Sequence, residues 1–469
     1  MKESQSRLEQ LPPGWAHAQL GDIAEVILGQ SPPSSTYNES GKGLPFYQGK
    51  LEFGKLCPTP RKWCAAPIKI AEKGDVLISV RAPVGPTNIC PEKSCIGRGL
   101  AAIRGLGGIG TLFVLYLLRV LESEIARKGT GTTFSAIGGG QLRGVKVPLP
   151  PLNEQVRIVA RLEELFARLD VGVEELQKVK AQLKRYRQAV LKYAFEGKLT
   201  EEWRKTHKDQ IEPQILFQSE DVAVPKLPEN WASARFGDVT KIIDYRGRTP
   251  PFSSQGIPHI RSSNVRDGRI LLSGLKYVSK EAFDKYMTRG LPHTNDLLFT
   301  TEAPLGEVAL VPEFAFSLAQ RLMILRPQKA VLNSKFLLYQ IMSPEFQGRL
   351  RGKGTGTTVT GVSSRNLKPI RILVAPLAEQ EKIGEEIEKV ISIIETMDSM
   401  VGTGFRQAVR LRQSILKSAF EGKLVPQDPS DEPAERLLGR VRADKAKSKG
   451  EKDTNRRNKS QLELSTYVK

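Results

Sequence analysis

The sequence predicts an α+β protein in which two globular regions are related by a pseudo-two-fold repeat and separated by two long helices forming an antiparallel coiled coil. Three observations predict this fold class. Two stretches, 153–195 and 379–420, carry heptad spacing. Both stretches are bounded by the same short motifs. The landmarks of one half of the chain also return in the same order in the other half, which indicates an internal duplication.

Each long stretch has an apolar stripe that is one seam wide. Its members alternate at steps of three and four, with occasional steps of seven. The seam residues that we expect to pair the helices or to dock a partner are Leu162, Phe166, Leu169, Leu176 and Leu183 in the first stretch, and Ile387, Ile394, Val401 and Ile415 in the second. A helix of this length would extend about 65 Å at about 1.5 Å per residue. Because so narrow a stripe cannot bury itself, each helix needs the other.

The boundaries of the two stretches match. Pro-Leu-x-Glu-Gln opens them at 151–155 and 376–380, and Ala-Phe-Glu-Gly-Lys-Leu closes them at 194–199 and 419–424. Proline near the start and glycine past the end are typical of helix boundaries. Two unrelated core helices are the alternative, but they would have to share a length and both end motifs by chance.

The globular regions repeat the same landmarks. Leu-Pro-x-x-Trp occurs at 11–15 and 227–231, Ala-Pro-x-Gly at 82–85 and 303–306, and Lys-Gly-Thr-Gly-Thr-Thr at 128–133 and 353–358. Short apolar runs between turn formers predict strands, for example 75–80 and 296–300, and 112–126 and 334–351 predict one amphipathic helix per copy. The expected domains are a globular region at 1–150, a long helix at 151–200, a linker at 201–226, a second globular region at 227–375, a second long helix at 376–425, and a charged, partly disordered tail at 426–469 with a short helix over 435–449.

The charge balance favours a polyanionic partner. The chain has 71 Lys and Arg against 51 Asp and Glu, a formal net charge of +20, and only +3 of this lies in 426–469. The N-terminus is polar and no apolar run of about 18 residues is present, so we expect a cytoplasmic protein with no membrane partner. Cys57, Cys64, Cys90 and Cys95 lack a C-x-x-C pair, which favours reduced structural thiols over a zinc site.

Taken together, these motifs resemble the specificity subunit of type I restriction–modification enzymes. The resemblance is carried by the duplicated Pro-Leu-x-Glu-Gln and Ala-Phe-Glu-Gly-Lys-Leu motifs, by Leu-Pro-x-x-Trp and by Gly-Thr-Gly-Thr-Thr, and it covers nearly the whole chain. It implies that each globular region is a target recognition domain for one half of a bipartite, asymmetric site on double-stranded DNA. It also implies that the helices set the spacing and dock two methyltransferase subunits, which carry S-adenosylmethionine, and that restriction or motor subunits join the complex. The chain itself would have no catalytic residue, no metal and no cofactor.

The absence of catalytic and metal-binding motifs in the sequence agrees with this interpretation. No Asn-Pro-Pro-aromatic loop of an amino methyltransferase occurs, and Gly-Thr-Gly-Thr-Thr lacks the Gly-Lys-Ser/Thr ending of a phosphate loop. The four His residues show no metal-ligand spacing.

Reading bases requires Arg, Lys, Asn or Gln presented to a groove, whereas Lys and Thr in small-residue loops suit phosphate contacts. We therefore expect the following residues to contact DNA: Gln48, Lys50, Arg81, Arg98, Lys128, Thr130 and Thr132 in the first copy, and Arg246, Arg248, Arg261, Asn264, Arg266, Lys353, Thr355 and Thr357 in the second. The alternatives are that an individual Arg contacts phosphate or solvent, and that the Lys-Gly-Thr loops serve only the fold.

Two other functions remain open from the residues alone. A coiled-coil scaffold that binds nucleic acid without sequence preference would show salt-dependent but sequence-blind binding. A self-sufficient methyltransferase or nuclease would show turnover by the purified chain.

Overall fold

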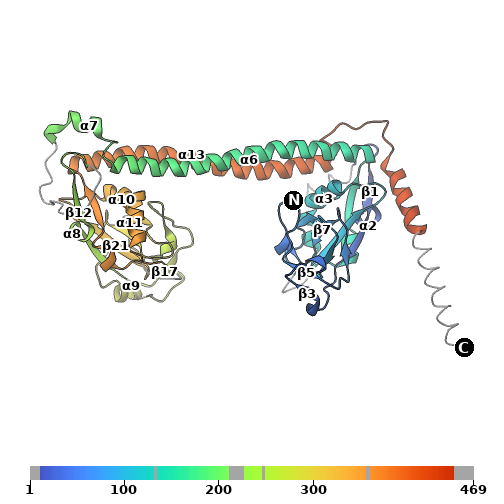
Figure 1. Ribbon diagram of the computed structural model, residues 1–469, viewed down its shortest axis with the longest axis horizontal. Helices are drawn as coiled ribbons and strands as arrows, with labels where there is room; N and C mark the ends of the chain where they lie inside the picture. The colour runs from blue at the N-terminus through green and yellow to red at the C-terminus, as the bar shows by residue number, and fades with distance from the viewer. Residues whose placement is uncertain (1–10, 131–134, 211–226, 246–248, 355–359, 448–469) are drawn as a thin grey trace. The chain divides into compact units, whose positions relative to one another are not determined.

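The computed structural model describes residues 11–130, 135–210, 227–245, 249–354 and 360–447 (Figure 1). The chain divides into two compact units. Unit 1 comprises Met1–Glu175 and Gly404–Lys469, and unit 2 comprises Leu176–Thr403. Each unit therefore contains one globular region together with part of each long helix.

The core of unit 1 is built on a four-stranded antiparallel sheet in the order β2-β10-β7-β8. These strands are Ala24–Leu28 (β2), Leu100–Gly105 (β10), Val76–Ser79 (β7) and Thr87–Ile89 (β8). All four residues of β7 are buried. Val76 and Ile78 face the large core under α3 (Thr111–Val120), whereas Leu77 faces a second cluster that contains Tyr47. Burial on both faces explains why the sequence of this strand is a continuous apolar run, as predicted.

Two smaller sheets complete unit 1. β1 (Ala16–Gln19) pairs with β11 (Lys146–Leu149), and a five-stranded sheet has the order β3-β5-β4-β9-β6. Its strands are Tyr37–Asn38 (β3), Lys62–Cys64 (β5), Leu44–Tyr47 (β4), Ser94–Ile96 (β9) and Ile70–Ala71 (β6). The short helices are Leu20–Ile23 (α2), Glu122–Lys128 (α4) and Gly139–Arg143 (α5), with helical turns at Ser34–Thr36 (η1) and Lys50–Glu52 (η2).

Unit 2 repeats this plan, which confirms the duplication. Its four-stranded sheet has the order β13-β21-β18-β19, a two-stranded sheet joins β12 to β22, and β14 lies between β17 and β20. The strands are Ala232–Arg235 (β12), Thr240–Asp244 (β13), Ile257–Ile260 (β14), Val265–Arg266 (β15), Arg269–Ile270 (β16), Lys276–Val278 (β17), Leu297–Thr300 (β18), Val308–Leu310 (β19), Ser317–Leu318 (β20), Leu322–Pro327 (β21) and Arg371–Val374 (β22). The short helices are Glu201–Thr206 (α7), Phe236–Val239 (α8), Lys280–Tyr286 (α9), Ser334–Met342 (α10), Pro344–Gly352 (α11) and Ser364–Leu367 (α12), with turns at Lys208–Gln210 (η3) and Ser262–Asn264 (η4).

The amphipathic helix predicted in each copy is in fact two helices. In unit 2 the break falls at Ser343, which precedes Pro344, has an extended backbone and caps α11 with its hydroxyl. A residue before proline is disfavoured in the α conformation, so the helix ends there. In unit 1 the break falls at Leu121, between α3 and α4, where no proline is involved.

The two long helices, α6 (Leu152–Phe195) and α13 (Leu377–Phe420), have 44 residues each. In unit 1 the beginning of α6 packs against the end of α13, where Leu162 and Phe166 share a core with Phe420. In unit 2 the end of α6 packs against the beginning of α13, where Leu191 shares a core with Ile387. The helices are therefore antiparallel neighbours in each unit, as predicted (Figure 1).

The predicted seam residues face inward. Leu162, Phe166, Leu183, Ile387, Ile394 and Val401 are buried, and Leu169, Leu176 and Ile415 are half-buried. Arg412 also covers this seam in unit 1, because its guanidinium lies 4.5 Å from the ring centre of Phe166 and pairs with Asp170.

The chain that follows each long helix supports the globular region of the other copy. In unit 1, Gly422 lies against Pro12, and in unit 2, Gly197 lies against Pro228, so closely that a Cβ at either glycine would meet a proline Cγ at 2.2 or 2.1 Å. Both glycines have positive φ, 71° and 75°. Both the positive φ and the close approach of the proline require glycine at these two positions, which explains why the closing motif is repeated.

Residues 434–447 form a helix that belongs to unit 1. Leu437, Leu438 and Val441 join the core, and the ammonium of Lys445 donates to the backbone carbonyl of Asp22 at 3.1 Å. The helix falls within the stretch where the sequence analysis expected one, but it is an integral part of the unit rather than part of a separate tail.

Candidate nucleic-acid interface

In each unit the two loops with repeated motifs lie together at one end of the four-stranded sheet. In unit 1, Ile137 donates its backbone N–H to the carbonyl of Val80 at 3.0 Å, and Ala136 forms isolated bridges with Arg81 and Thr130. In unit 2, Val362 donates to Thr301 at 3.0 Å, and Gly361 bridges Glu302. The Ala-Pro-x-Gly loop is thus held to the segment that follows the Lys-Gly-Thr motif in both units.

The Ala-Pro-x-Gly loop is closed by the same backbone hydrogen bond in both copies. Gly85 donates to the carbonyl of Ser79 at 3.0 Å, and Gly306 donates to that of Thr300 at 3.0 Å. Both glycines have positive φ, 117° and 85°, which favours glycine at this turn. The repeated spacing of the motif therefore reflects a rigid loop that directs the residue preceding it, Arg81 in unit 1 and Glu302 in unit 2.

A second turn adjoins this loop. This turn comprises residues 97–99 before β10 in unit 1 and residues 319–321 before β21 in unit 2. Its last residue accepts a backbone hydrogen bond from the end of the neighbouring strand. Val80 donates to Gly99 at 2.9 Å, and Thr301 donates to Arg321 at 3.0 Å. In unit 1 the turn also touches Gln48, because a Cβ at Gly99 would lie 2.1 Å from the carbonyl oxygen of Gln48. We refer to the segments 48–52, 81–85, 97–99, 128–130 and 135–136 of unit 1, with the segments 261–264, 302–306, 319–321, 353–354 and 360–361 of unit 2, as the reading ends.

Ion pairs that each contain one buried aspartate hold the sheet behind the reading ends. Asp75 and Asp296, from the repeated Gly/Asn-Asp motif, are 2 and 3% exposed. Asp75 accepts from Arg104 Nε at 2.8 Å, and Asp296 accepts from Arg326 Nη2 at 2.7 Å. The hydrogen bond to the Asp75 carboxylate raises the pKa of Arg104, and Asp296 does the same for the pKa of Arg326. Each Asp also caps its own turn, so both strands of the sheet are locked to it.

The structure places most of the predicted first-copy residues at this reading end. Gln48, Lys50, Arg81, Arg98 and Thr130 are exposed there. Lys128 is half-buried, and its ammonium lies 3.1 Å from the carboxylate of Glu124, which reduces the charge that it offers to a phosphate. Thr132 lies outside the described residues.

The predicted second-copy residues fall into three groups. Arg246, Arg248, Thr355 and Thr357 lie outside the described residues. Lys353 is exposed and Arg261 and Arg266 are half-buried. Asn264 is 3% exposed, with its amide nitrogen donating to Leu271 at 2.9 Å and its amide oxygen accepting from the backbone of Arg261 at 3.1 Å. In this structure Asn264 therefore shapes the loop and does not present its amide to a groove.

Sequence reasoning missed Gln320 and Arg321. Both are exposed at the second turn, and Arg321 Nε lies 2.8 Å from a carboxylate oxygen of Glu302. The sequence offers little to identify them, because Gly97-Arg98-Gly99-Leu100 and the corresponding Ala319-Gln320-Arg321-Leu322 share only the leucine. Only the shared hydrogen bonds reveal that the two turns correspond.

The remaining repeated motifs position the globular regions on the helices. Trp15 Nε1 donates to Glu154 at 2.9 Å, and Trp231 Nε1 donates to Glu379 at 2.9 Å. Both carboxylates are almost fully buried, at 1 and 0% exposed. Burial raises the pKa of Glu154, although its hydrogen bonds with Trp15 and Gln427 oppose this. The Leu-Pro-x-x-Trp and Pro-Leu-x-Glu-Gln motifs are therefore two halves of one contact.

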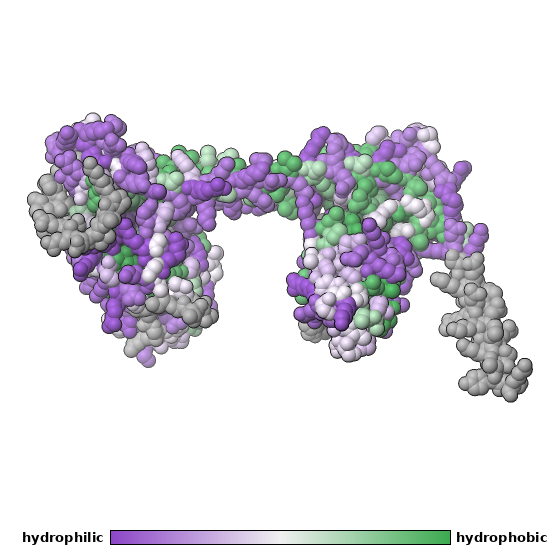
Figure 2. All heavy atoms as spheres, viewed as in Figure 1, coloured by the Kyte–Doolittle hydropathy of each residue, from purple (hydrophilic) through white to green (hydrophobic). Residues whose placement is uncertain are grey.

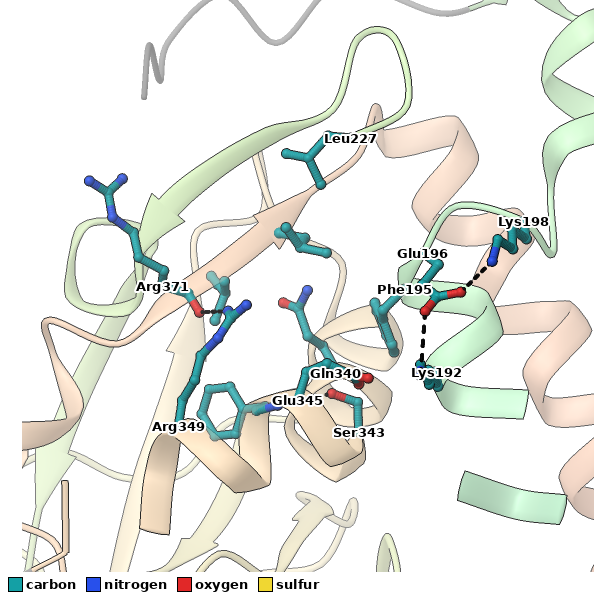
Figure 3. A pocket seen from close by; sticks show the side chains of 13 residues that line it. Lys192, Phe195, Glu196, Lys198, Leu227, Gln340, Ser343, Glu345, Arg349 and Arg371 are labelled. Atoms are coloured by element: carbon teal, nitrogen blue, oxygen red, sulfur yellow. Dashed lines mark hydrogen bonds and ion pairs between the residues drawn. The ribbon is translucent and has the colours of Figure 1, made fainter. Parts of the chain in front are cut away.

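Unit 2 also contains a cavity of about 490 Å³, bordered by α6, α10, α11 and β22 (Figure 3). Gln340 points into it and is 4% exposed, and no hydrogen-bond partner of its Oε1 was found in the described part of the chain. The structural counterpart of Gln340 in α3 is Leu117, which follows a matching Tyr and is fully buried.

No metal-binding cluster is found among the described residues, meaning no group of three or more His, Cys, Asp or Glu side chains. Cys64, Cys90 and Cys95 are buried free thiols and Cys57 is exposed. Burial raises the pKa of Cys90 to about 11 and that of Cys95 to about 12. In the same part of the chain, no helix combines the length and the apolar character needed to cross a membrane.

Two globular regions that share one frame but carry different side chains at the reading end define a recognition protein with two readers. The chain matches the family model of the type I restriction modification DNA specificity domain over residues 12–181 and 228–399. The chain belongs to this family of specificity subunits, as the resemblance in the sequence implied, and specificity subunits are non-catalytic members of type I restriction–modification complexes.

Curated relatives agree over most of the chain. The EcoDI and EcoKI specificity subunits of Escherichia coli are 24 and 25% identical to it, each match covering 94% of this chain and 98% of the relative. A specificity subunit named for the MjaX enzyme of Methanocaldococcus jannaschii is 41% identical over 197 residues, so that match spans 45% of the relative. Among solved structures, one from a study of complex assembly and conformational transition of the type I R-M system has a TM-score of 0.64 at 20% identity and covers 88% of this chain and 99% of its own, which shows the shared fold.

Proposed function

We propose that each unit reads one block of a bipartite DNA site through its reading end, and that the two blocks differ in sequence. The observation that carries this proposal is the pair of reading ends, which keep the same backbone hydrogen bonds but exchange Arg81 for Glu302. The Arg81 side chain favours acceptor atoms such as those of guanine, whereas Glu302 is paired with Arg321 and would present a neutralised pair to the groove. Two independent readers require a common backbone arrangement that carries side chains with different preferences for bases.

The formal charge of +20 supports DNA as the partner. Lys and Arg side chains around the reading ends would neutralise phosphates and release counterions, and this supplies much of the affinity. Because the substrate would be genomic DNA, we place the complex in the cytoplasm.

The long helices would set the distance between the two blocks. A helix of 44 residues extends about 66 Å at about 1.5 Å per residue, comparable to about 19 base pairs at about 3.4 Å each. Deleting one heptad from both helices preserves the seam and shortens each by about 10 Å. We expect the preferred gap to shorten by about three base pairs, and an unchanged gap would refute the spacing role.

The docking surface for two methyltransferase subunits would lie outside the seam, since most of the seam residues are buried within the protein. Ile393, Met397 and Met400 are 58, 48 and 68% exposed and lie at steps of four and three on one face of α13. Figure 2 shows that the visible face of unit 2 is otherwise largely hydrophilic. An apolar stripe on a polar surface suits a partner helix. S-adenosylmethionine would be bound by these partners, and restriction subunits would join through the complex.

The test is binding to a panel of duplexes, with the methyltransferase partner present. Each duplex carries two sequence blocks, varied one base pair at a time, with a gap of varied length. The expected result is an affinity that depends on both blocks and on the gap. Salt-dependent binding that ignores sequence would instead indicate a coiled-coil scaffold and would refute the proposal.

A further inference from the structure

We propose that Arg98 and Gln320 are equivalent base readers, and that Arg98 selects guanine in one block while Gln320 selects adenine in the other. This assignment rests on the proposed function, because it takes the reading ends to be the surfaces that face DNA. It goes further by naming one position per unit and the base edge that each would bind.

The two side chains occupy the same position of the same turn. Backbone hydrogen bonds define this turn in both units. Three backbone hydrogen bonds recur around Arg98 and Gln320. The residue two positions after each of them donates its N–H to the carbonyl of the residue just before it, which closes the turn. The residue just before it donates its own N–H to the neighbouring strand, and the residue just after it accepts from the N–H at the end of the central strand. The bonds are Leu100 to Gly97 at 3.0 Å, Gly97 to Tyr47 at 2.8 Å and Val80 to Gly99 at 2.9 Å in unit 1, and Leu322 to Ala319 at 3.2 Å, Ala319 to Ile260 at 2.9 Å and Thr301 to Arg321 at 3.0 Å in unit 2.

The turn is rigid, but the two side chains are available. In unit 1 a Cβ at Gly99 would meet the carbonyl oxygen of Gln48 at 2.1 Å, and the backbone N–H of Arg98 donates to Ser31 Oγ at 3.2 Å. Arg98 and Gln320 are both exposed. No side-chain hydrogen bond of either was found within the described ranges of the chain. The fixed backbone lowers the entropy that binding would cost, and the unengaged polar heads are available to bond a base.

The residue types match the donor and acceptor code of the major groove. A guanidinium donates two hydrogen bonds to O6 and N7 of guanine, whereas a glutamine amide donates to N7 and accepts from N6 of adenine. The neighbours strengthen the distinction. Arg321, beside Gln320, is paired with Glu302 at 2.8 Å, so the reading end of unit 2 carries a neutralised pair where unit 1 carries Arg81.

The exchange of the two residues tests the assignment. Arg98→Gln and Gln320→Arg are made separately in the full chain and assayed with the methyltransferase partner on the duplex panel. Arg98→Gln should change the preference at one base pair of one block from guanine to adenine, and Gln320→Arg should change one base pair of the other block from adenine to guanine. We expect each preference to change by about 5- to 150-fold, the range of one good bidentate contact.

Arg440→Gln is the matched control. It removes the same charge, but Arg440 lies on the helix 434–447 and pairs with Glu432 at 2.6 Å. It should leave the preference at every base pair unchanged. Co-elution of each variant with the methyltransferase partner shows that the variant is folded, and because the two exchanges lie in different units, each tests the assignment independently.

The outcomes separate the assignment from the function on which it rests. Wild-type binding that ignores both blocks would refute the proposed function itself. Discrimination by the wild type together with a uniform loss of affinity in Arg98→Gln across all duplexes would show a phosphate contact and overturn the assignment. Unchanged preference in both exchanges would overturn it as well.

Discussion

The two buried glutamates that receive the tryptophan hydrogen bonds predict different responses to the same substitution. Glu379 also accepts from Thr200 Oγ1 at 2.7 Å and forms an ion pair with Arg204, whose side chain is 14% exposed. Within the described ranges Glu154 has no such ion pair, and its second partner is the neutral amide of Gln427 at 3.5 Å. Replacing each by Gln keeps the shape of the side chain, removes the charge and converts one of the two acceptor oxygens into an NH2 donor.

The expected costs follow from what is left behind. Glu379→Gln leaves the half-buried Arg204 without this counter-charge, and breaking an ion pair with a buried partner costs about 3 kcal/mol. Glu154→Gln keeps an amide oxygen as acceptor for Trp15 Nε1 and removes a charge that burial already disfavours, so its cost should stay below about 1 kcal/mol.

Hydrogen exchange measures this difference in each unit separately, which a single melting temperature of a chain with two units cannot do. A loss of about 3 kcal/mol from local stability accelerates exchange by about 150-fold. We expect this acceleration at residues 381–390 of α13 in Glu379→Gln, and less than about five-fold acceleration at residues 156–165 of α6 in Glu154→Gln.

A double variant provides the control. Arg204→Met together with Glu379→Gln removes the stranded charge and should restore part of the protection. Equal acceleration in the two single variants, or no recovery in the double variant, would refute the reasoning that an uncompensated Arg204 carries the cost.

Two further predictions concern unit 2. Burial lowers the pKa of His259 to about 4, and a lowered pKa contributes stability that is present above the unfolded value of about 6.5 and is lost as pH falls towards 4. The expected loss in the free energy of unfolding over this pH window is roughly 3 kcal/mol. His259→Phe, which copies Phe46 at the matching register of unit 1, should reduce this loss, as measured by hydrogen exchange at pH 7 and at pH 4.5. An unchanged pH dependence in the variant would contradict this account. Gln340→Leu, which copies Leu117 of unit 1, removes a buried oxygen without a partner in the described structure and should stabilise unit 2 by about 1 kcal/mol in denaturant titration, whereas destabilisation would show that the amide has a partner in solution (Figure 3).

Much of the fold could be predicted because it is written in periodic or duplicated patterns. The heptads predicted two helices of matching length, and the seam residues that they identified, such as Phe166 and Ile387, are buried. The apolar run at 75–80 predicted a strand, and the structure has one at Val76–Ser79. The breaks at Leu121 and Ser343 were not predicted, because the apolar periodicity continues through both and only Pro344 marks one of them.

The candidate site was less predictable. Exposed Arg and Gln residues near repeated motifs were good candidates in unit 1, where the motifs and the reading end coincide in the sequence. In unit 2 the same approach selected Asn264, which the fold uses to hold its own loop, and passed over Gln320. A side chain with free hydrogen-bonding groups and one whose groups are already engaged have the same letter in a sequence.

The sequence by itself determined the number of readers, the lengths of the two helices and their seam, because duplication and heptad spacing are properties of order along the chain. The tertiary structure alone decided which segments share a core. The end of α13 and the helix 434–447 complete unit 1, and the end of α6 completes unit 2, because each closing glycine packs against the opening proline of the other copy. That close contact depends on two segments meeting in space, and residue spacing along the chain does not record it.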